Sequence, residues 1–406
     1  MPSRSIFPST LAVLALLAGC GEPGGSPGPG VTVSDSLGVA VHAWGHSEDD
    51  LDTWAYDPEP VLRLGALEGS TPDVFGRISS LVLGSDGGVT VTDDLAGEVR
   101  SFSASGTHVG TLGGLGEGPG EFSTSLALLR VAGDSVWVWD QRQRRLSIFA
   151  GGVFARSWTV PADVLLSRPV LVGSRVFGEA NQRLTGLPET GMSRPPATVV
   201  VVGREGSASE LLMSDGHERF LDIQMANGQI SAVNVFQPPF ARGFFFGVVE
   251  SGGGARVIGG PNDRLALREW SEDGELRAIH RYAALDRPVT DARVQRAREV
   301  ITARFDEPSP ALRQQLDLLE STLPEYVPAF DRVWPDDENR LWVRRSVEDG
   351  VEEWMVLGVE DLRPLARIVL PRGFALMDVR TGLLGGRWLD ELDVSHAQVY
   401  RLRTGA

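Results

Sequence analysis

Lysine is absent from this chain of 406 residues, so all 38 basic residues are arginines. The absence excludes chemistries that need a lysine, including Schiff-base formation, a lysine general base and a phosphate-binding P-loop. Acidic residues number 54, and the formal net charge is −16. Such a surface repels phosphate backbones, and we therefore expect no nucleic-acid partner.

Cysteine is nearly absent, since Cys20 is the only one. It follows Arg4 and an apolar run from Leu11 to Leu17, which is the order of a secretory signal peptide. The run is shorter than the ~20 apolar residues that span a bilayer. A secreted chain with a single thiol has no disulfide partner of its own.

The four residues from Leu17 to Cys20 resemble a bacterial lipobox. The resemblance implies a signal peptide over residues 1–19 and lipid attachment at Cys20. Residues 20–30 are rich in glycine and proline and would form a flexible tether. The sorting rule that goes with this resemblance favours the outer membrane of a Gram-negative-type bacterium, because a glycine follows the cysteine. We expect an envelope protein that meets the membrane through its lipid.

Residues of the same type recur 47 positions apart, as in Phe75 and Phe122 or Asp93 and Asp140. Each unit contains four strand-length pieces separated by turn residues. In the first unit these pieces are Ile78–Leu83, Val89–Thr92, Glu98–Ser103 and His108–Leu112. A period of about 40–50 residues with four strands is typical of a β-propeller blade.

Weaker units with the same frame begin near Pro169, Phe244, Phe330 and Phe374. The last unit ends one strand short. Because unpaired sheet edges are unfavourable, we expect an N-terminal strand within Val31 to Val41 to complete it. The sequence therefore predicts an all-β fold, a six-bladed β-propeller closed by an N-terminal strand.

The link from Gly116 to Phe122 reads GEGPGEF. It resembles the six-bladed propellers of the NHL-repeat kind, and is similar to a family of bacterial six-bladed β-propeller lipoproteins in which a GxGPGEF segment opens the second blade. The resemblance implies one propeller over residues 31–406 and a location in the cell envelope. It implies no assigned activity.

One segment has helical rather than strand periodicity. Thr290 to Arg304 carries apolar residues on one helical face, and Ser309-Pro310 is a helix start followed by leucines at helical spacing. We predict a two-helix insertion at about residues 287–325, between the fourth and fifth blades. The helices either pack on the rim of the propeller or form a lid or docking platform.

No catalytic motif is present, and no catalytic residue is assigned. The glycine-rich stretch Gly113 to Gly120 lacks lysine and fits neither nucleotide-binding fingerprint. His42 and His46 lie beside several acidic residues, an arrangement that favours a solvated acidic loop over a metal site.

Carboxylate and amide side chains supply the candidate ligand-binding face. Turns after the second strand of a unit and links between units share one face of a propeller, so these side chains would surround one channel mouth. They are Asp93, Asp94, Glu117, Glu121, Asp140, Asn262 and Asp263. We expect no cofactor, although these oxygens could bind a hard cation such as calcium. The alternative is structural, with Asp93 and Asp140 capping turns.

Two functions follow from these observations. The first is a monomeric, non-catalytic scaffold that binds an envelope protein, a glycan or a small ligand. The alternative is a calcium-dependent hydrolase of the lactonase or esterase type. Six-bladed lactonases hold calcium with a Glu, Asn and Asp set from separate blades, and no stretch of this chain matches their motifs.

Overall fold

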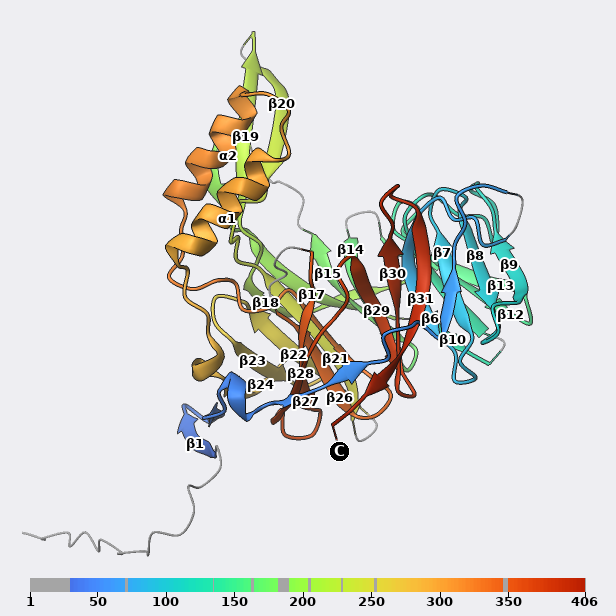
Figure 1. Cartoon of the computed structure of the whole chain (residues 1–406), viewed down its shortest axis with the longest axis horizontal. Coiled ribbons are helices and arrows are strands. Elements are labelled where there is room, and N and C mark those ends of the chain that lie inside the picture. The colour runs from blue at the N-terminus through green and yellow to red at the C-terminus, as the bar shows by residue number, and fades with distance from the viewer. Residues whose placement is uncertain are drawn as a thin grey trace, which may run out of the picture.

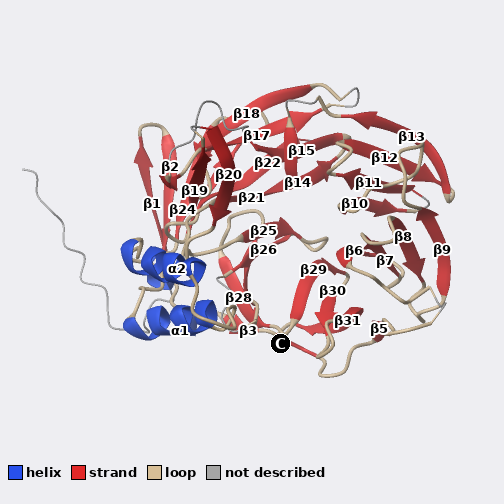
Figure 2. Ribbon diagram, turned by 90° about the horizontal axis from the view of Figure 1, so that it is seen from above, coloured by secondary structure: helices blue, strands red, loops and turns tan. Residues whose placement is uncertain are grey.

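The computed structural model describes residues 30–69, 72–133, 135–161, 164–181, 190–203, 206–227, 229–251, 254–345 and 350–405. Within these ranges the chain is mostly β-structure, with two α-helices, α1 (Asp291–Thr302) and α2 (Pro310–Ser321), and two short 3-10 helices. The sheets stand side by side around a centre, as Figure 2 shows from above. This arrangement is a β-propeller, and it confirms the all-β class predicted from the repeat.

The first two sheets follow the clearest part of the repeat. Their strands are β6 (Ile78–Leu83), β7 (Val89–Asp93), β8 (Glu98–Phe102) and β9 (His108–Gly113), followed by β10 (Leu126–Ala132), β11 (Ser135–Asp140), β12 (Arg145–Ala150) and β13 (Val153–Thr159). Alternate residues of a strand share one face, so Val136 and Val138 both enter the core that contains Val99 of the preceding sheet. Phe122 is fully buried in the same core.

The link between these two sheets folds back on itself. Phe122 donates its backbone N–H to the carbonyl of Gly114 at 2.8 Å. Gly113 has a φ of +90°, and a side chain there would meet the ring of Phe122. Glycine is therefore required at this position for both its conformation and its closeness to the aromatic ring.

Three of the remaining sheets of the ring are built from four-strand units, and the last is built from a unit of three strands. All four follow the same order along the chain. They contain β14 (Leu165–Val172), β15 (Arg175–Asn181), β17 (Pro196–Val202) and β18 (Ala208–Asp215); β21 (Phe244–Ser251), β22 (Gly254–Pro261), β23 (Ala266–Trp270) and β24 (Leu276–Arg281); β25 (Arg332–Pro335), β26 (Arg340–Arg344), β27 (Glu353–Gly358) and β28 (Pro364–Val369); and β29 (Phe374–Arg380), β30 (Leu383–Leu389) and β31 (Ser395–Arg403).

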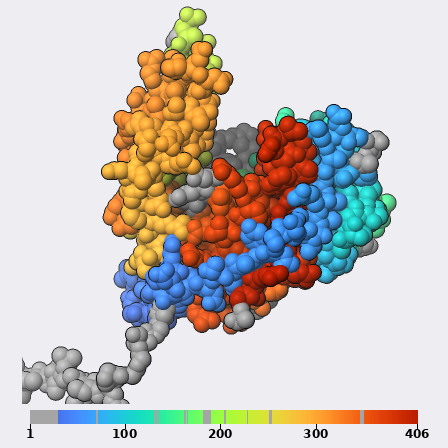
Figure 3. Space-filling model, in the orientation of Figure 1, coloured from blue at the N-terminus to red at the C-terminus, as the bar shows by residue number. Residues whose placement is uncertain are grey.

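The N-terminal segment runs along the outside of three sheets, shown in blue in Figure 3. Its strands are β1 (Val31–Ser36), β2 (Val39–Trp44), β3 (Asp52–Thr53), β4 (Ala55–Tyr56) and β5 (Leu62–Leu64). β1 and β2 form a hairpin that adds to β24, β3 adds to β28, and β4 and β5 both add to β31.

The segment predicted to complete the last unit, Val31 to Val41, was therefore the wrong one. β5 completes that unit, because Leu62 and Leu64 are buried while the intervening Arg63 is exposed. β1, by contrast, is exposed at every position and buries nothing against β31. Leu62 and Leu64 share a core with residues of the first and last sheets, including Val89.

A structure that we call the extension rises above one side of the ring (Figure 1). It consists of α1, α2 and a small sheet formed by β16 (Gly191–Ser193), β19 (Arg219–Ala226) and β20 (Gln229–Phe236). Thr290 caps α1, and Ser309 caps α2 directly before a proline at the first helical position. Ile301, Leu312 and Leu319 pack the helices together and against Phe240 of the β20–β21 link.

Candidate functional site

Asp93 is a buried capping residue. Its carboxylate accepts backbone N–H bonds from Gly76 at 3.0 Å, Arg77 at 3.1 Å and Leu95 at 3.2 Å. The Arg100 guanidinium lies 3.3 Å away. These donors tie the entry of the first unit to the end of its second strand, so both oxygens of this carboxylate are engaged in holding the backbone.

Asp140 repeats this arrangement one unit later. It is fully buried, and it accepts the backbone N–H and the hydroxyl of Ser123, each at 2.6 Å, and the N–H of Gln143 at 2.9 Å. Asn262 plays the same part with an amide: Oδ1 accepts from Gly243 at 2.7 Å, and Nδ2 donates to the carbonyl of Phe330 at 2.7 Å. The recurrence of these positions therefore has a structural cause.

The other predicted carboxylates lie in different surroundings. Asp94 accepts from the Ser79 hydroxyl at 2.5 Å, and burial raises its pKa. For Asp263 burial acts in the same direction, but hydrogen bonds and charge from Arg194 outweigh it and lower the pKa. Among the described residues, Glu121 accepts one nearby backbone N–H, that of Gly118.

The seven predicted residues do not converge on one point. The side chain of Glu117 is exposed, and only its backbone carbonyl is engaged, by Arg145. Across the described ranges, no group of three or more His, Cys, Asp or Glu side chains is placed to hold a metal ion. Calcium binding by the predicted residues stays a prediction.

A pocket of about 770 Å³ lies where the extension meets the ring. One wall is α1, the other is the β20–β21 link, and the floor includes residues that precede β25. Asn262 is the member of the predicted set that lines it. The volume is within the range of about 300–1,000 Å³ that is usual for ligand sites.

The lining of this pocket includes four aromatic rings and three arginines. The rings are Phe236, Phe240, Phe245 and Phe330, and the arginines are Arg293, Arg296 and Arg304. Arg293 and Arg296 are three residues apart in α1, a spacing that places their side chains on one face of the helix, and Arg304 lies two residues beyond its end. Two consecutive prolines fix the opposite link, so both walls are built on stiff backbone.

Phe245 connects the pocket to a polar cluster in the ring. The Arg168 guanidinium carbon lies 4.9 Å from the centre of the Phe245 phenyl group, and the imidazole of His217 packs edge-on against the same phenyl group. Arg168 pairs with Glu179 and donates to Nε2 of His217 at 2.8 Å. Because an arginine can only donate, His217 accepts as a neutral ring. Burial, and then the charge of Arg168, lower the pKa of His217 to about 4.

A second ion network borders the pocket at Asp331. Both oxygens of its carboxylate accept from Arg344, at 2.6 and 3.0 Å. Arg344 also pairs with Glu352 at 2.5 Å. Burial lowers the pKa of the neighbouring Arg332 to about 10, which leaves it cationic at neutral pH. The acidic groups beside the pocket are thus neutralised by arginines of the ring.

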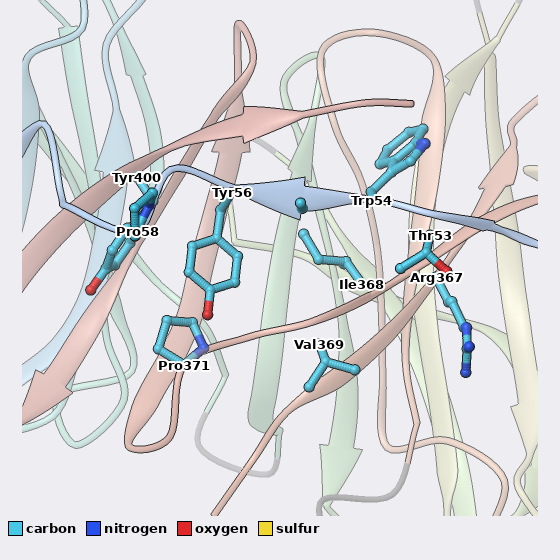
Figure 4. Close-up of a pocket in the computed structure, with 10 residues that line it drawn as sticks. Thr53, Trp54, Tyr56, Pro58, Arg367, Ile368, Val369, Pro371 and Tyr400 are labelled. Atoms are coloured by element: carbon cyan, nitrogen blue, oxygen red, sulfur yellow. The ribbon is translucent and has the colours of Figure 1, made fainter. Parts of the chain in front are cut away.

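A smaller pocket of about 540 Å³ lies on the outside of the ring, where the N-terminal segment crosses from β28 to β31 (Figure 4). Trp54, Tyr56, Pro371 and Tyr400 line it, and Arg367 is its one charged side chain. Trp54 and Tyr400 also belong to the core beneath. We interpret this hollow as the seam between the N-terminal segment and the ring, since it brings together no convergent polar groups.

Sequence reasoning missed β19 and β20, and with them the pocket. Their signal was present in the alternating Leu221 to Gln224 and Ile230 to Val235, but these segments fall between two repeat units and match neither. Among the described helices, none is long and apolar enough to cross a membrane. Fold and site together define a β-propeller with a pocket-bearing extension over one face.

Comparisons with known proteins find only distant similarity. No family model and no curated protein match the chain. A DUF4221 family member from Bacteroides vulgatus is 10% identical with a TM-score of 0.48, covering 87% of this chain and 98% of its own. Regucalcin, a calcium-binding protein from Agrobacterium tumefaciens, is 11% identical with a TM-score of 0.36, covering 87% and 97%.

Virginiamycin B lyase from Staphylococcus aureus is 10% identical with a TM-score of 0.39, covering 81% of this chain and 95% of its own. All three TM-scores are below 0.5. We therefore argue no activity, ligand or site of this chain from them.

Proposed function

We propose that this protein is a lipid-anchored envelope protein whose six-bladed β-propeller binds a ligand without catalysing a reaction, on the face that carries the extension. The observation that carries the proposal is the pocket between α1 and the β20–β21 link. It is concave, largely apolar and built on stiff walls, which is what small-molecule sites require.

Six blades are supported by the strand pairing. The sheets that begin with β6, β10, β14, β21, β25 and β29 each repeat one order, and β5 serves as the outer strand of the last. On this interpretation residues 31–406 form one propeller. α1 and α2 lie in the link between the fourth and fifth blades, and β19 and β20 lie in the link between the third and fourth blades.

The anchor rests on the sequence, because Cys20 and residues 1–29 lie outside the described residues. Outer-membrane attachment through Cys20 stays a prediction, as do a monomeric state and the choice among a protein, a glycan and a small ligand. Detergent partitioning of the protein and of Cys20→Ala, both made in a lipoprotein-competent host, tests the anchor. Equal recovery of both in the aqueous phase would refute it.

Among the described residues, no cluster of metal-ligating side chains favours the hydrolase alternative. A calcium-dependent hydrolase needs oxygen ligands that converge on calcium. The side-chain oxygens of Asp93, Asp140 and Asn262 instead accept hydrogen bonds from backbone N–H groups. A screen of esters and lactones with and without calcium checks this directly. Calcium-dependent turnover that Asp140→Asn abolishes, in a protein that is still folded, would replace our proposal.

The binding proposal is tested with a neutral apolar probe, N-phenyl-1-naphthylamine, followed by its fluorescence. Val300 lines the pocket and is 43% exposed, so Val300→Glu should block the site without unfolding the protein. Leu323 is also 43% exposed and lies outside the pocket lining, which makes Leu323→Glu the matched control. Saturable binding that only Val300→Glu removes is expected, and equal binding by both variants would contradict the proposed site.

A further inference from the structure

We infer that the pocket selects an anionic amphiphile, a small molecule with a carboxylate-like or sulfonate-like group on an apolar body. This inference rests on the proposed function and adds the chemical class of the ligand. The pocket lining and the whole chain have charges of opposite sign, since the protein carries a net charge of −16 while the lining is positive.

Three arginines and a single acid line the pocket. The acid is Asp331, and its two oxygens are both engaged by Arg344. The lining therefore carries more positive than negative charge. An anion is repelled by the protein elsewhere and attracted here, and a potential of this kind raises both the local concentration and the specificity of a charged ligand.

Arg304 is the arginine best placed to hold the anionic group. It follows the last turn of α1, it is exposed, and its side chain makes no ion pair or hydrogen bond with any described residue. Arg296 lies on the same wall, and its pair with Glu299 at 3.4 Å joins two side chains that are each more than half exposed. Glu299 balances part of the charge of Arg296, so the anionic group is assigned to Arg304.

The apolar body of the ligand is expected to lie against the four phenylalanines. Phe236 is the last residue of β20 and Phe240 lies in the link that follows it, whereas Phe245 and Phe330 come from the ring beneath. Arg168 behind Phe245 is paired with Glu179, and Asp331 is paired with Arg344, so the charges beside the aromatic floor are balanced. The pocket thus has a cationic side and an aromatic side, which matches an amphiphile in both parts.

Two probes that differ in one group separate these contributions. 8-Anilinonaphthalene-1-sulfonate has the aromatic body of N-phenyl-1-naphthylamine together with an anionic sulfonate. We expect one equivalent of the sulfonate to bind by calorimetry, about tenfold or more tighter than the neutral probe, as one charged hydrogen bond would provide. Decanoate should displace it, and decanol should do so much less well.

Arg304→Gln should remove most of the preference for the sulfonate and leave the affinity for the neutral probe unchanged. Arg313→Gln is the matched control, because Arg313 is exposed on α2 and does not line the pocket. Equal affinities for the two probes, or the same loss in both variants, would overturn the inference while leaving the proposed function intact. Failure of both probes to bind the wild-type protein would remove the proposed function as well.

Discussion

The first two sheets are built from a sequence repeat, whereas the extension is not. In the sheets, residues recur 47 positions apart, and Asp93 and Asp140 make equivalent bonds to the backbone. The extension has no repeat: its helices come from the link between β24 and β25, β19 and β20 come from the link between β18 and β21, and β16 comes from the connection between β15 and β17. These elements meet the ring at a pocket. What recurs in this molecule holds the ring together, and what does not recur forms the site.

The difference follows from what each region must satisfy. A buried carboxylate at the end of a second strand has to be paired in every blade, because an unpaired one is costly. A link only has to connect two blades, so it can lengthen without disturbing the sheets. Function is therefore expected in the links, even though the most conspicuous polar residues lie in the repeat.

The largest effect should come from breaking a repeated cap. Asp140→Ala removes an acceptor of three hydrogen bonds and leaves buried donors unpaired, so we expect the free energy of unfolding to fall by about 3–4 kcal/mol. Glu121→Ala, on the same face, removes one exposed bond and should cost less than about 1 kcal/mol. Urea unfolding measures both, and equal losses would break the distinction.

Ring closure gives the next largest effect. Leu64 is 5% exposed and packs between the last and first sheets, so Leu64→Ala should lower the free energy of unfolding by about 3 kcal/mol. Val33 in β1 is 57% exposed, and Val33→Ala should change it by less than about 0.5 kcal/mol. The reverse order would mean that β1, rather than β5, closes the ring.

Acid should destabilise the ring through a buried histidine. Burial, and then the charge of His42 stacked on it, lower the pKa of His280 to about 4, from 6.5. The unfolded chain therefore takes up the proton first, so the contribution of His280 is complete above pH 6.5 and is lost as the pH falls toward 4. At pH 5 the loss is about 2 kcal/mol.

His280→Gln should therefore make the free energy of unfolding less dependent on pH between 7.5 and 5. Chemical unfolding at these two pH values measures the change. An unaltered pH dependence in the variant would show that the stacked histidines of β2 and β24 do not contribute to acid sensitivity.

The smallest effect on stability is expected in the extension. Arg304→Gln changes an exposed side chain without an ion pair among the described residues, so its melting behaviour should match the wild type within about 0.5 kcal/mol. Its effect should be on ligand binding alone. A clear loss of stability would mean that Arg304, like Asp140, has a structural role.

Much of the ring was predictable because one physical pattern repeats. Alternation in Val89 to Asp93 and the turn glycines around it predict strands that the structure contains almost residue for residue. Ser309 and Pro310 likewise predict the start of α2. Such signals are local, and a local signal survives in a single sequence.

The closing strand and the pocket were not predictable in the same way. β5 has three residues, too few for its alternation to stand out, and β1 shows a longer pattern that buries nothing. The pocket joins Phe236, Arg304 and Phe330, which are far apart along the chain and meet only through the packing of the extension. Of the predicted site residues, Asn262 reaches it.

The most direct test of the account compares one residue from each region by two measurements, unfolding by urea and titration with N-phenyl-1-naphthylamine. Asp93→Asn should lose stability, because its amide cannot accept all the N–H bonds of the carboxylate. While it is folded, this variant should bind the probe as the wild type does. Val300→Glu should keep its stability and lose the probe. The opposite pattern, with binding lost in folded Asp93→Asn and retained in Val300→Glu, would contradict the claim that the repeat holds the ring and the extension binds the ligand.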